Sequence, residues 1–318
     1  MHDGSVHIVI VNWNSGRQLG QCLASLTTAA RDNVELTVTI VDNASRDGSA
    51  DSLPAGYPPA KLIRNPENRG FAAACNQGAA GSSSDYLLFL NPDTRLSAGS
   101  LERPARFLTD PAHQAIGIVG VQLVDEQGHV TRSSTRRPAA AALIGQALGL
   151  DRLMPTVFPP LLMLDWPHDE TRTVDQVMGA FVFVRRPLFE ALGGFDERFF
   201  VYFEDLDLAV RAKNRGFETV YLASTRIVHR GAGTTDAIKG QRLFHLGRSR
   251  ILYALKHYSR IGALGVIAAT LLIEPIVRIT YSFISTRAGT AREIARGFRL
   301  LWCDVRNIMR THARFNGA

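Results

Sequence analysis

The chain has 318 residues, of which 46% are hydrophobic, so it can bury the core of one large domain or two ordinary ones. Its three cysteines, Cys22, Cys75 and Cys303, are too scattered for a disulfide framework or a zinc site, which favours a reducing, cytosolic compartment. The first residues lack the charged, apolar and small-residue pattern of a signal peptide, so we expect none.

The net charge of +7 is divided unevenly along the chain. Residues 239–318 contain 14 Lys and Arg against 3 Asp and Glu, whereas residues 1–238 contain 22 against 26. A mildly acidic body followed by a strongly basic region indicates two parts with different tasks. The partner of the basic region should be anionic: a membrane surface, a nucleic acid or a phosphorylated substrate.

The first third of the chain alternates short apolar runs with segments of helical spacing. The patterns predict strands and helices in the order strand 6–11, helix 19–26, strand 36–41, strand 61–63, helix 70–80 and strand 86–90. Alternation of this kind is typical of a mostly parallel α/β sheet with helices on both faces.

Polar residues follow the predicted strands where each of them ends. The uninterrupted apolar run 86–90 indicates a strand buried on both faces, and Pro92 must end it because proline cannot donate to a sheet ladder. Asn91 and Asp93 then lie at the carboxyl end of that strand, as Asp42 does after the second strand. Open α/β sheets bind ligands at this edge. The alternative is a polar turn that only closes a core strand.

The next segments are predicted with less detail. A helix is expected over residues 101–108, strands over 116–124, 174–184 and 217–222, and a loop over 125–138. Gly179 inside the predicted strand 174–184 indicates a bulge or a close approach of backbone to ligand. His229 follows in a glycine-rich loop, where a lone histidine counts as functional only if other site residues converge on it.

Acidic and aromatic residues cluster in the segment 199–211. Glu204, Asp205 and Asp207 follow four aromatic residues and begin a predicted helix. Acids in a first helical turn can simply favour the helix dipole. A carboxylate beside an apolar cluster, however, has its pKa raised, which suits a general base. We favour the functional interpretation.

The basic region 239–318 is predicted to be helical and amphipathic. Its longest uncharged run, residues 261–273, is 13 residues long and is followed by Glu274-Pro275, whereas a spanning helix needs about 20 apolar residues. We therefore expect no transmembrane helix. Cationic residues beside an apolar face are typical of helices that lie on a membrane. The alternative is a helical cap packed on the sheet domain.

Five separate segments carry a resemblance to the family 2 inverting glycosyltransferases with the GT-A fold, closest to the bacterial rhamnosyltransferase-type members. The segments are V-N-W-N (11–14), V-D-N-A-S-R-D-G (41–48), N-R-G-F-A-A-A-C-N-Q-G (68–78), L-N-P-D (90–93) and F-x-x-Y-F-E-D-x-D-L-x-x-R (199–211). The resemblance covers about residues 5–235, and the order and spacing of the segments make it specific.

The resemblance implies a GT-A, Rossmann-like domain over residues 1–238 and a basic helical region over 239–318 that associates with membrane or acceptor, or serves oligomerisation. Asp205 would be the catalytic base, with Glu204 beside it. Asp93 and His229 would hold Mg²⁺ or Mn²⁺ on the donor diphosphate. The residues expected to bind the nucleotide sugar are Asn12, Asn14, Asp42, Asn43, Asn68, Gly70, Asn76, Asn91, Asp93 and Gly179.

Two features depart from the family pattern. Asn91 stands at the first position of the D-x-D element, which leaves the metal fewer anionic protein ligands. The Q-x-x-R-W element of processive synthases is missing, which favours addition of a single sugar. We therefore predict a metal-dependent inverting hexosyltransferase of cell-wall or polysaccharide biosynthesis.

The expected donor is dTDP-L-rhamnose, and the acceptor a polyprenyl-diphosphate-linked or other glycan. The enzyme would lie at the cytoplasmic face of the cell membrane as a peripheral protein, and it could form a homo-oligomer. No nucleic-acid partner is expected. The alternatives are a UDP-sugar donor on the same fold and, less favoured, a non-catalytic protein that binds membrane or nucleic acid.

Overall fold

The computed structural model describes residues 4–29, 33–51, 60–231, 239–284 and 288–316. The chain divides into two compact units. The sheet unit contains residues 1–136, 162–197 and 204–234, and the helical unit contains residues 137–161, 198–203 and 235–318. The expected boundary at residue 238 lies close to the start of the last segment, but two earlier segments also belong to the helical unit.

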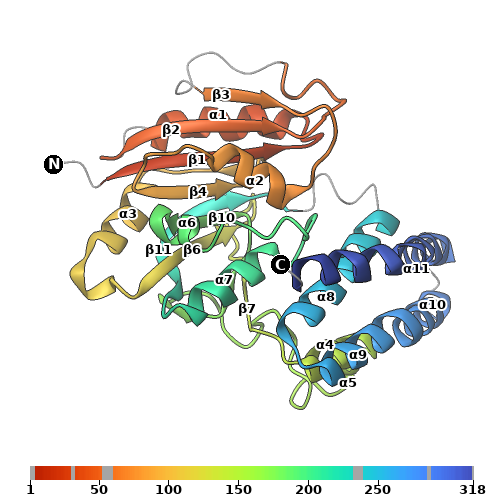
Figure 1. Cartoon of the computed structure of the whole chain (residues 1–318). Coiled ribbons are helices and arrows are strands. Elements are labelled where there is room, and N and C mark those ends of the chain that lie inside the picture. Colours follow the sequence, from red (N-terminus) through yellow and green to blue (C-terminus); the bar gives the residue numbers. More distant parts are fainter. Residues whose placement is uncertain (1–3, 30–32, 52–59, 232–238, 285–287, 317–318) are drawn as a thin grey trace. The chain divides into compact units, whose positions relative to one another are not determined.

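The sheet unit is built on one mixed sheet with the strand order β3-β2-β1-β4-β10-β6-β11-β5, with β8 paired to β11 (Figure 1). The strands that run in one direction are β1 (Ser5–Asn12), β2 (Glu35–Asp42), β3 (Ala60–Arg64), β4 (Tyr86–Leu90), β6 (Ile116–Val124) and β11 (Glu218–His229). The strands of opposite direction are β5 (Thr94–Arg95), β8 (Arg172–Val174) and β10 (Phe181–Arg185). The predicted, mostly parallel α/β sheet is confirmed.

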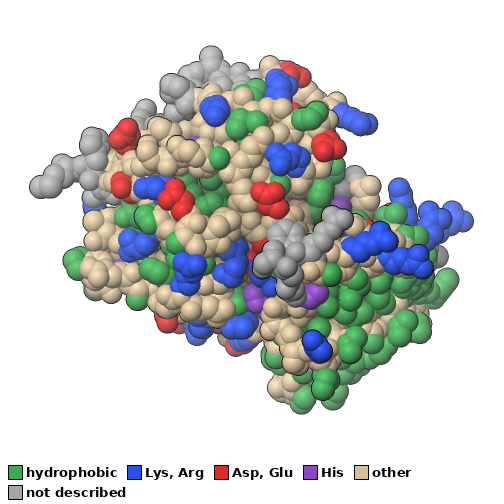
Figure 2. All heavy atoms as spheres, viewed as in Figure 1, with side chains coloured by type: hydrophobic (Ala, Val, Ile, Leu, Met, Phe, Trp, Pro, Cys, Tyr) green, Lys and Arg blue, Asp and Glu red, His purple; other side chains and the backbone are tan. Residues whose placement is uncertain are grey.

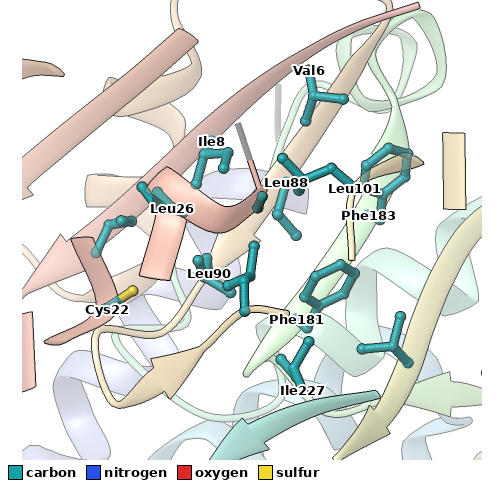
Figure 3. Close-up of a cluster of buried hydrophobic side chains, with 14 of the residues drawn as sticks. Val6, Ile8, Cys22, Leu26, Leu88, Leu90, Leu101, Phe181, Phe183 and Ile227 are labelled. Atoms are coloured by element: carbon teal, nitrogen blue, oxygen red, sulfur yellow. The ribbon is translucent and has the colours of Figure 1, made fainter. Parts of the chain in front are cut away.

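Both faces of this sheet are buried, as the unbroken apolar strands indicate. Alternate residues of β4 point to opposite sides: Leu88 and Leu90 belong to one core cluster, and Leu87 and Phe89 to the other. Figure 3 shows the first cluster, in which Leu88 and Leu90 lie near Cys22 and Leu26 of one helix. That face is covered by α1 (Arg17–Ala29) and α3 (Glu102–Thr109), and the other by α2 (Phe71–Ala79), α6 (Arg186–Ala191) and α7 (Glu204–Asn214).

The prediction of one strand over residues 174–184 was wrong. The segment is divided between β8, which pairs with β11, β9 (Gln176–Val177), which pairs with β7 (Ser134–Thr135), and β10, which pairs with β4 and β6. At the break, the backbone N–H of Gly179 donates to the Asp205 carboxylate instead of to a neighbouring strand. The chain leaves the sheet there because its hydrogen-bond donor is used by the site.

His229 was expected in a glycine-rich loop, but it is the last residue of β11. This strand is twelve residues long because an irregularity between Leu222 and Arg226 lets it continue beside β6. Its final residues pair with β5, so that His229 lies opposite Thr94. The longer strand therefore carries the histidine to the end of the sheet where Asp93 lies.

The helical unit contains α4 (Ala140–Ala147), α5 (Leu150–Leu153), α8 (Lys239–His257), α9 (Arg260–Ala268), a π-helical turn (Ala269–Ile273), α10 (Glu274–Ile284) and α11 (Ala288–Asn316). Glu274-Pro275 does not end the apolar segment, contrary to the prediction. Proline at 275 lacks an N–H and displaces the carbonyl of Leu271, and that carbonyl accepts a hydrogen bond of 2.9 Å from the Trp302 indole.

The helical run Arg260–Ile284 is therefore 25 residues long, and by length and composition it could cross a membrane. One such run is a weak indication, because a core helix of a soluble protein meets the same criterion. A third of its most apolar window is buried within the protein. The run is thus long enough to span a bilayer, and part of it is packed inside the protein.

Candidate active site

The candidate site lies where β1, β2 and β4 end. Asn12 at the end of β1 pairs in register with Asp42 at the end of β2. The antiparallel strand β10 begins beside the end of β4, with Phe181 opposite Leu90, and the Asn91 N–H donates to the Ala180 carbonyl at 3.1 Å. Segments from distant parts of the sequence therefore meet at the carboxyl edge of the sheet, where open α/β sheets bind ligands.

Asn12 supports Asp42 from inside the protein. Its side chain is fully buried, its Nδ2 donates to Asp42 Oδ1 at 2.8 Å and to Ser49 Oγ at 2.9 Å, and its Oδ1 accepts from Ser15. No polar atom of Asn12 is left for a ligand in this arrangement. Its contribution to a nucleotide site would be to orient the Asp42 carboxylate.

Hydrogen bonds link the loop after β2 to the start of α2 through Asn43, Asn68 and Gly70. Asn43 Nδ2 donates to Asn68 Oδ1 at 2.8 Å and to the Gly70 carbonyl at 3.1 Å, while its Oδ1 accepts from the Arg69 N–H at 3.0 Å. Gly70 has φ +86°, a conformation that favours glycine. Asn14 locks the neighbouring loop, since its Oδ1 accepts from the Arg46 N–H at 2.8 Å.

Asn76 is directed toward a different part of the sheet unit. Its Nδ2 donates to the Phe195 carbonyl at 2.8 Å and to Glu197 Oε1 at 3.0 Å, and its Oδ1 accepts from the Phe195 N–H at 2.9 Å. A Cβ on Gly194 would lie only 2.6 Å from Asn76 Oδ1, so glycine is required there. Asn76 therefore anchors the segment that leads to the acidic helix, and its side chain is not available to a nucleotide in this structure.

Asp93 and His229 come together as the resemblance implied. Asp93 Oδ2 lies 3.4 Å from His229 Nε2, and both side chains are mostly buried. The Arg230 N–H donates to the Asp93 carbonyl at 3.1 Å, which holds the two segments side by side. Asp93 also lines a small hollow with Gln18, Gln21 and other residues.

This pair tests whether a divalent metal fits the site. No group of three or more His, Cys, Asp or Glu side chains in the described part of the chain could hold a metal ion. The Asn91 side chain makes no hydrogen bond with the described residues, so its carbonyl oxygen is free to turn toward Asp93. A carboxylate, an imidazole and an amide oxygen suit Mn²⁺ or Mg²⁺ only if donor phosphates and water complete the shell. The donor set fits a metal shared with a diphosphate.

Asp205 is the first acid of α7 to face the site, and two backbone groups hold it. Its Oδ2 accepts from the Gly179 N–H at 2.9 Å, and its Oδ1 accepts from the Leu206 N–H at 2.8 Å. A Cβ on residue 179 would lie 3.3 Å from Oδ2, tighter than an ordinary contact. Burial raises the pKa of Asp205, while the two N–H groups oppose that rise. Asp205 is therefore a poised, oriented carboxylate.

Glu204 is buried beside Asp205, and its carboxyl group has fewer hydrogen-bond donors around it. Its Oε2 has no hydrogen-bond partner among the described residues. Burial, and then the charges of Asp205 and Asp207, raise the pKa of Glu204 well above its usual range. Two N–H donors stabilise the ionised form of Asp205 and none is directed at Glu204 Oε2, so the protonated form is favoured more strongly at Glu204 than at Asp205. The ionised form of Asp205 is therefore better stabilised by hydrogen bonds than that of Glu204.

The sequence analysis missed Gln176. Its side chain is buried at β9, accepts a hydrogen bond from Thr135, and lowers the pKa of Asp205 through a side-chain hydrogen bond. A polar residue inside the apolar run 174–184 was the available signal. The sequence also gave no sign that Tyr202 and Phe203, directly before Glu204, have φ of +69° and +68°. Such conformations are strained in large residues and recur at functional sites.

Comparison with known proteins assigns the chain to a family. The model of glycosyl transferase family 2 matches residues 7–157, and that of glycosyl transferase family group 2 matches residues 86–303. The chain is a family 2 glycosyltransferase.

Relatives of this glycosyltransferase include the N-acetylglucosaminyl-diphospho-decaprenol L-rhamnosyltransferase of Mycobacterium tuberculosis, which is 28% identical over 79% of the chain and 84% of the relative. The pre-mycofactocin glycosyltransferase of the same organism is 25% identical over 87% of the chain and 55% of the relative. The resemblance to family 2 glycosyltransferases close to the rhamnosyltransferases is thus confirmed.

The glycosyltransferase has the GT-A fold of its structural neighbours. A mannosyltransferase from Pyrobaculum calidifontis, solved with GDP-Man and Mn²⁺, superposes with a TM-score of 0.52 at 16% identity, covering 95% of this chain and 86% of that one. GalNAc-T7, solved with UDP, GalNAc and Mn²⁺, gives a TM-score of 0.50 at 14% identity, covering 89% of this chain and 57% of that one. At these identities the likeness shows the fold alone.

Proposed function

We propose that this glycosyltransferase transfers one L-rhamnose from dTDP-L-rhamnose to a hydroxyl group of a polyprenyl-diphosphate-linked glycan, with inversion at the anomeric carbon. The single observation that carries the chemistry is the Asp205 carboxylate, held by the Gly179 N–H next to Ala180, whose carbonyl accepts from the Asn91 N–H. The mycobacterial rhamnosyltransferase, similar over most of both chains, supports the sugar and the class of acceptor.

Asp205 is the proposed general base. It removes the proton from the acceptor hydroxyl as the oxygen attacks the anomeric carbon, and the bond from that carbon to the diphosphate oxygen breaks with its electron pair on the leaving dTDP. A single displacement of this kind inverts the anomeric centre, and the proton ends on Asp205. Burial of Asp205 favours its protonated form, which assists acceptance of the proton.

Asp93 and His229, with Asn91 beside them, would hold Mg²⁺ or Mn²⁺. The bound ion would neutralise charge on the departing diphosphate. Asp42, oriented by Asn12, would contact the base or ribose of the nucleotide. Asn14, Asn43, Asn68 and Gly70 would keep the shape of the nucleotide loops through their own hydrogen bonds.

We infer that the protein works at the cytoplasmic face of the membrane, near a lipid-linked acceptor, with residues 239–318 as the part that attaches. The strongly basic charge of that region supports this location. The reaction belongs to the assembly of a cell-wall or surface polysaccharide.

The test is transfer from dTDP-L-rhamnose to a short-chain polyprenyl-diphosphate sugar, compared with UDP-sugar donors. Asp205→Asn should lower kcat by about 10²- to 10⁴-fold, the usual contribution of a general base, and leave dTDP affinity nearly unchanged. Glu190→Gln on the surface is the matched control. Substantial transfer by Asp205→Asn would contradict the base assignment. Transfer from UDP sugars only would contradict the donor and leave the base in place.

A further inference from the structure

The helical unit carries an apolar stripe along one side of the run Arg260–Ile284. The exposed side chains recur at helical spacing and have exposed fractions from 38% to 84%. They are Ile261, Leu264, Leu272, Ile273, Ile276, Tyr281, Phe283 and Ile284. At 1.5 Å per residue the stripe from Ile261 to Ile284 is about 35 Å long. Soluble proteins seldom expose so much contiguous apolar surface without a partner.

The stripe continues onto α5 within the same unit. The Arg152 guanidinium lies over the Tyr281 ring at 5.6 Å from its centroid, which places α5 beside α10. Leu153, at the end of α5, and Val157, four residues further along the chain, are 76% and 66% exposed. Figure 2 shows the resulting apolar area over this part of the helical unit, with Lys and Arg side chains beside it along α11.

α11 supplies a row of arginines at spacings of three, four or seven residues. The members are Arg292, Arg296, Arg299, Arg306 and Arg310, all exposed. None of them makes an ion pair or hydrogen bond with another residue that the structure describes. The acids of this helix are used elsewhere: Asp304 pairs with Arg248 at 3.0 Å, and Glu293 accepts from the Gly240 N–H at 3.1 Å. These five arginines therefore leave their positive charge unpaired by described residues along the exposed side of α11.

Trp302 joins the arginine row to the stripe. Its indole donates to the Leu271 carbonyl, and half of its surface is exposed. Tryptophan with an apolar body and one polar edge is typical of the boundary between headgroups and acyl chains.

The opposite side of the run is packed and carries its only buried charge. Glu274 is 2% exposed and binds Arg250 of α8 at 2.5 Å and Arg278 at 2.7 Å. Crossing a bilayer as a separate helix would remove Glu274 from Arg250 and expose it to lipid, which is costly. The run therefore keeps α8 on one side and offers the other side outward.

We propose that this stripe inserts into one leaflet of an anionic bilayer, with the run Arg260–Ile284 parallel to the membrane plane and the α11 arginines on the lipid phosphates. Charge complementarity selects the bilayer over a second copy of the chain, whose arginine row would be repelled by this one. The proposal rests on the proposed function only for its purpose, which is to reach a lipid-linked acceptor.

Binding of the full chain to acceptor-free vesicles tests the proposal. Phosphatidylcholine mixed with phosphatidylglycerol should bind the protein, and phosphatidylcholine alone should bind it much more weakly. Leu272→Ser should lower the partition coefficient about tenfold. The triple variant that combines Ile261→Ser, Leu264→Ser and Ile276→Ser, called the stripe variant, should not bind. Leu164→Ser, at a site 55% exposed in the sheet unit, is the control.

Charge variants separate the two parts of the surface. Each of Arg296→Gln, Arg299→Gln and Arg306→Gln should weaken binding to anionic vesicles about fivefold and leave binding to neutral vesicles unchanged. Arg215→Gln, exposed in the sheet unit, is the control. Lipids brominated near the headgroup should quench fluorescence of the unmodified protein more than that of Trp302→Phe.

Three results would overturn the proposal. They are full vesicle binding by the stripe variant, retention in the membrane after alkaline carbonate washing, and a dimer of the unmodified chain that the stripe variant converts to a monomer. Transfer to a water-soluble acceptor should be equal for the stripe variant and the unmodified chain. Absence of transfer with both proteins would contradict the proposed function. It would not affect the conclusion drawn from vesicle binding.

Discussion

At the scale of single residues, the site combines groups whose protonation is set by unequal partners. Asp205 receives two backbone N–H groups, and its neighbour Glu204 is buried with one oxygen unpaired. Glu204 is buried and Asp205 is half-buried, and the difference in hydrogen bonding adds to this difference in burial. Two adjacent carboxyl groups on one helix therefore differ in how strongly each favours its protonated form.

The ionised Glu204 carboxylate should destabilise the fold, and replacing it with the neutral amide of glutamine should remove this effect. Because its pKa is raised in the folded state, ionisation of Glu204 destabilises the fold as pH rises above the usual glutamate range. Glu204→Gln should therefore raise Tm at neutral pH by about 2 to 4 °C, the shift that about 1 kcal/mol produces in a domain of moderate size. Calorimetry compares it with Glu218→Gln on the surface. A lower Tm would contradict this prediction and would show that the folded protein stabilises the ionised Glu204 carboxylate.

Asn91 should limit the affinity for metal. A second carboxylate beside Asp93 adds an anionic ligand, so Asn91→Asp should lower the Mn²⁺ concentration for half-maximal activity about tenfold. Asp93→Asn is expected to raise it. Titration of transfer activity, and of Mn²⁺ binding with dTDP present, gives both values. Equal Mn²⁺ requirements for all three proteins would remove these residues from the metal site.

At the scale of elements, the helical unit is held together by a buried ionic cluster. Arg250 and Glu274 are each 2% exposed, and Arg278 completes the cluster from the next turn of α10. The segment 198–203 is fastened to the same helix α8, since Ser249 Oγ donates to the Val201 carbonyl at 2.8 Å. This segment directly precedes Glu204 in the chain.

Removing one partner of the Arg250–Glu274 pair should destabilise the fold far more than replacing both partners with apolar residues. Glu274→Ala leaves the Arg250 guanidinium buried without its anion and should cost about 3 to 5 kcal/mol of the free energy of unfolding. Arg250→Met combined with Glu274→Leu should cost much less, because no uncompensated charge remains. Urea unfolding measures both. Equal losses for the single and double variants would mean that packing volume, and not charge, sets the stability here.

At the scale of the whole molecule, buried histidines make stability depend on pH. Burial lowers the pKa of His7, His168 and His245, that of His245 to about 4. The unfolded chain binds protons at these positions near pH 6.5, and the folded chain binds them only at lower pH. Their contribution is therefore complete above pH 6.5 and is lost as pH falls toward 4.

His245 should dominate this loss in the helical unit, where it stacks on Phe200 at 4.6 Å between ring centroids. Lowering the pH from 8 to 5 should remove about 2 kcal/mol through His245 alone. His245→Gln should remove most of this dependence. Unfolding measured at several pH values gives the slope. An unchanged slope in the variant would assign the acid sensitivity to His7, His168 or other groups.

The sequence by itself determined the α/β class, the family and the identities of the acidic residues, because apolar runs, strand-ending polar residues and motif spacing are local properties. It placed Asp42 and Asp93 correctly at strand ends. It did not show that Asn12 and Asn76 turn inward, since their partners lie 30 and 119 residues away in the chain.

Only the tertiary structure decided three further points. It divided residues 174–184 among different strand pairings and used Gly179 to hold Asp205. It carried His229 along β11 to Asp93. It continued the apolar helix through Pro275, because Trp302 satisfies the Leu271 carbonyl and Arg250 neutralises Glu274. Each depends on a partner distant in sequence, and local patterns carry no information about such partners.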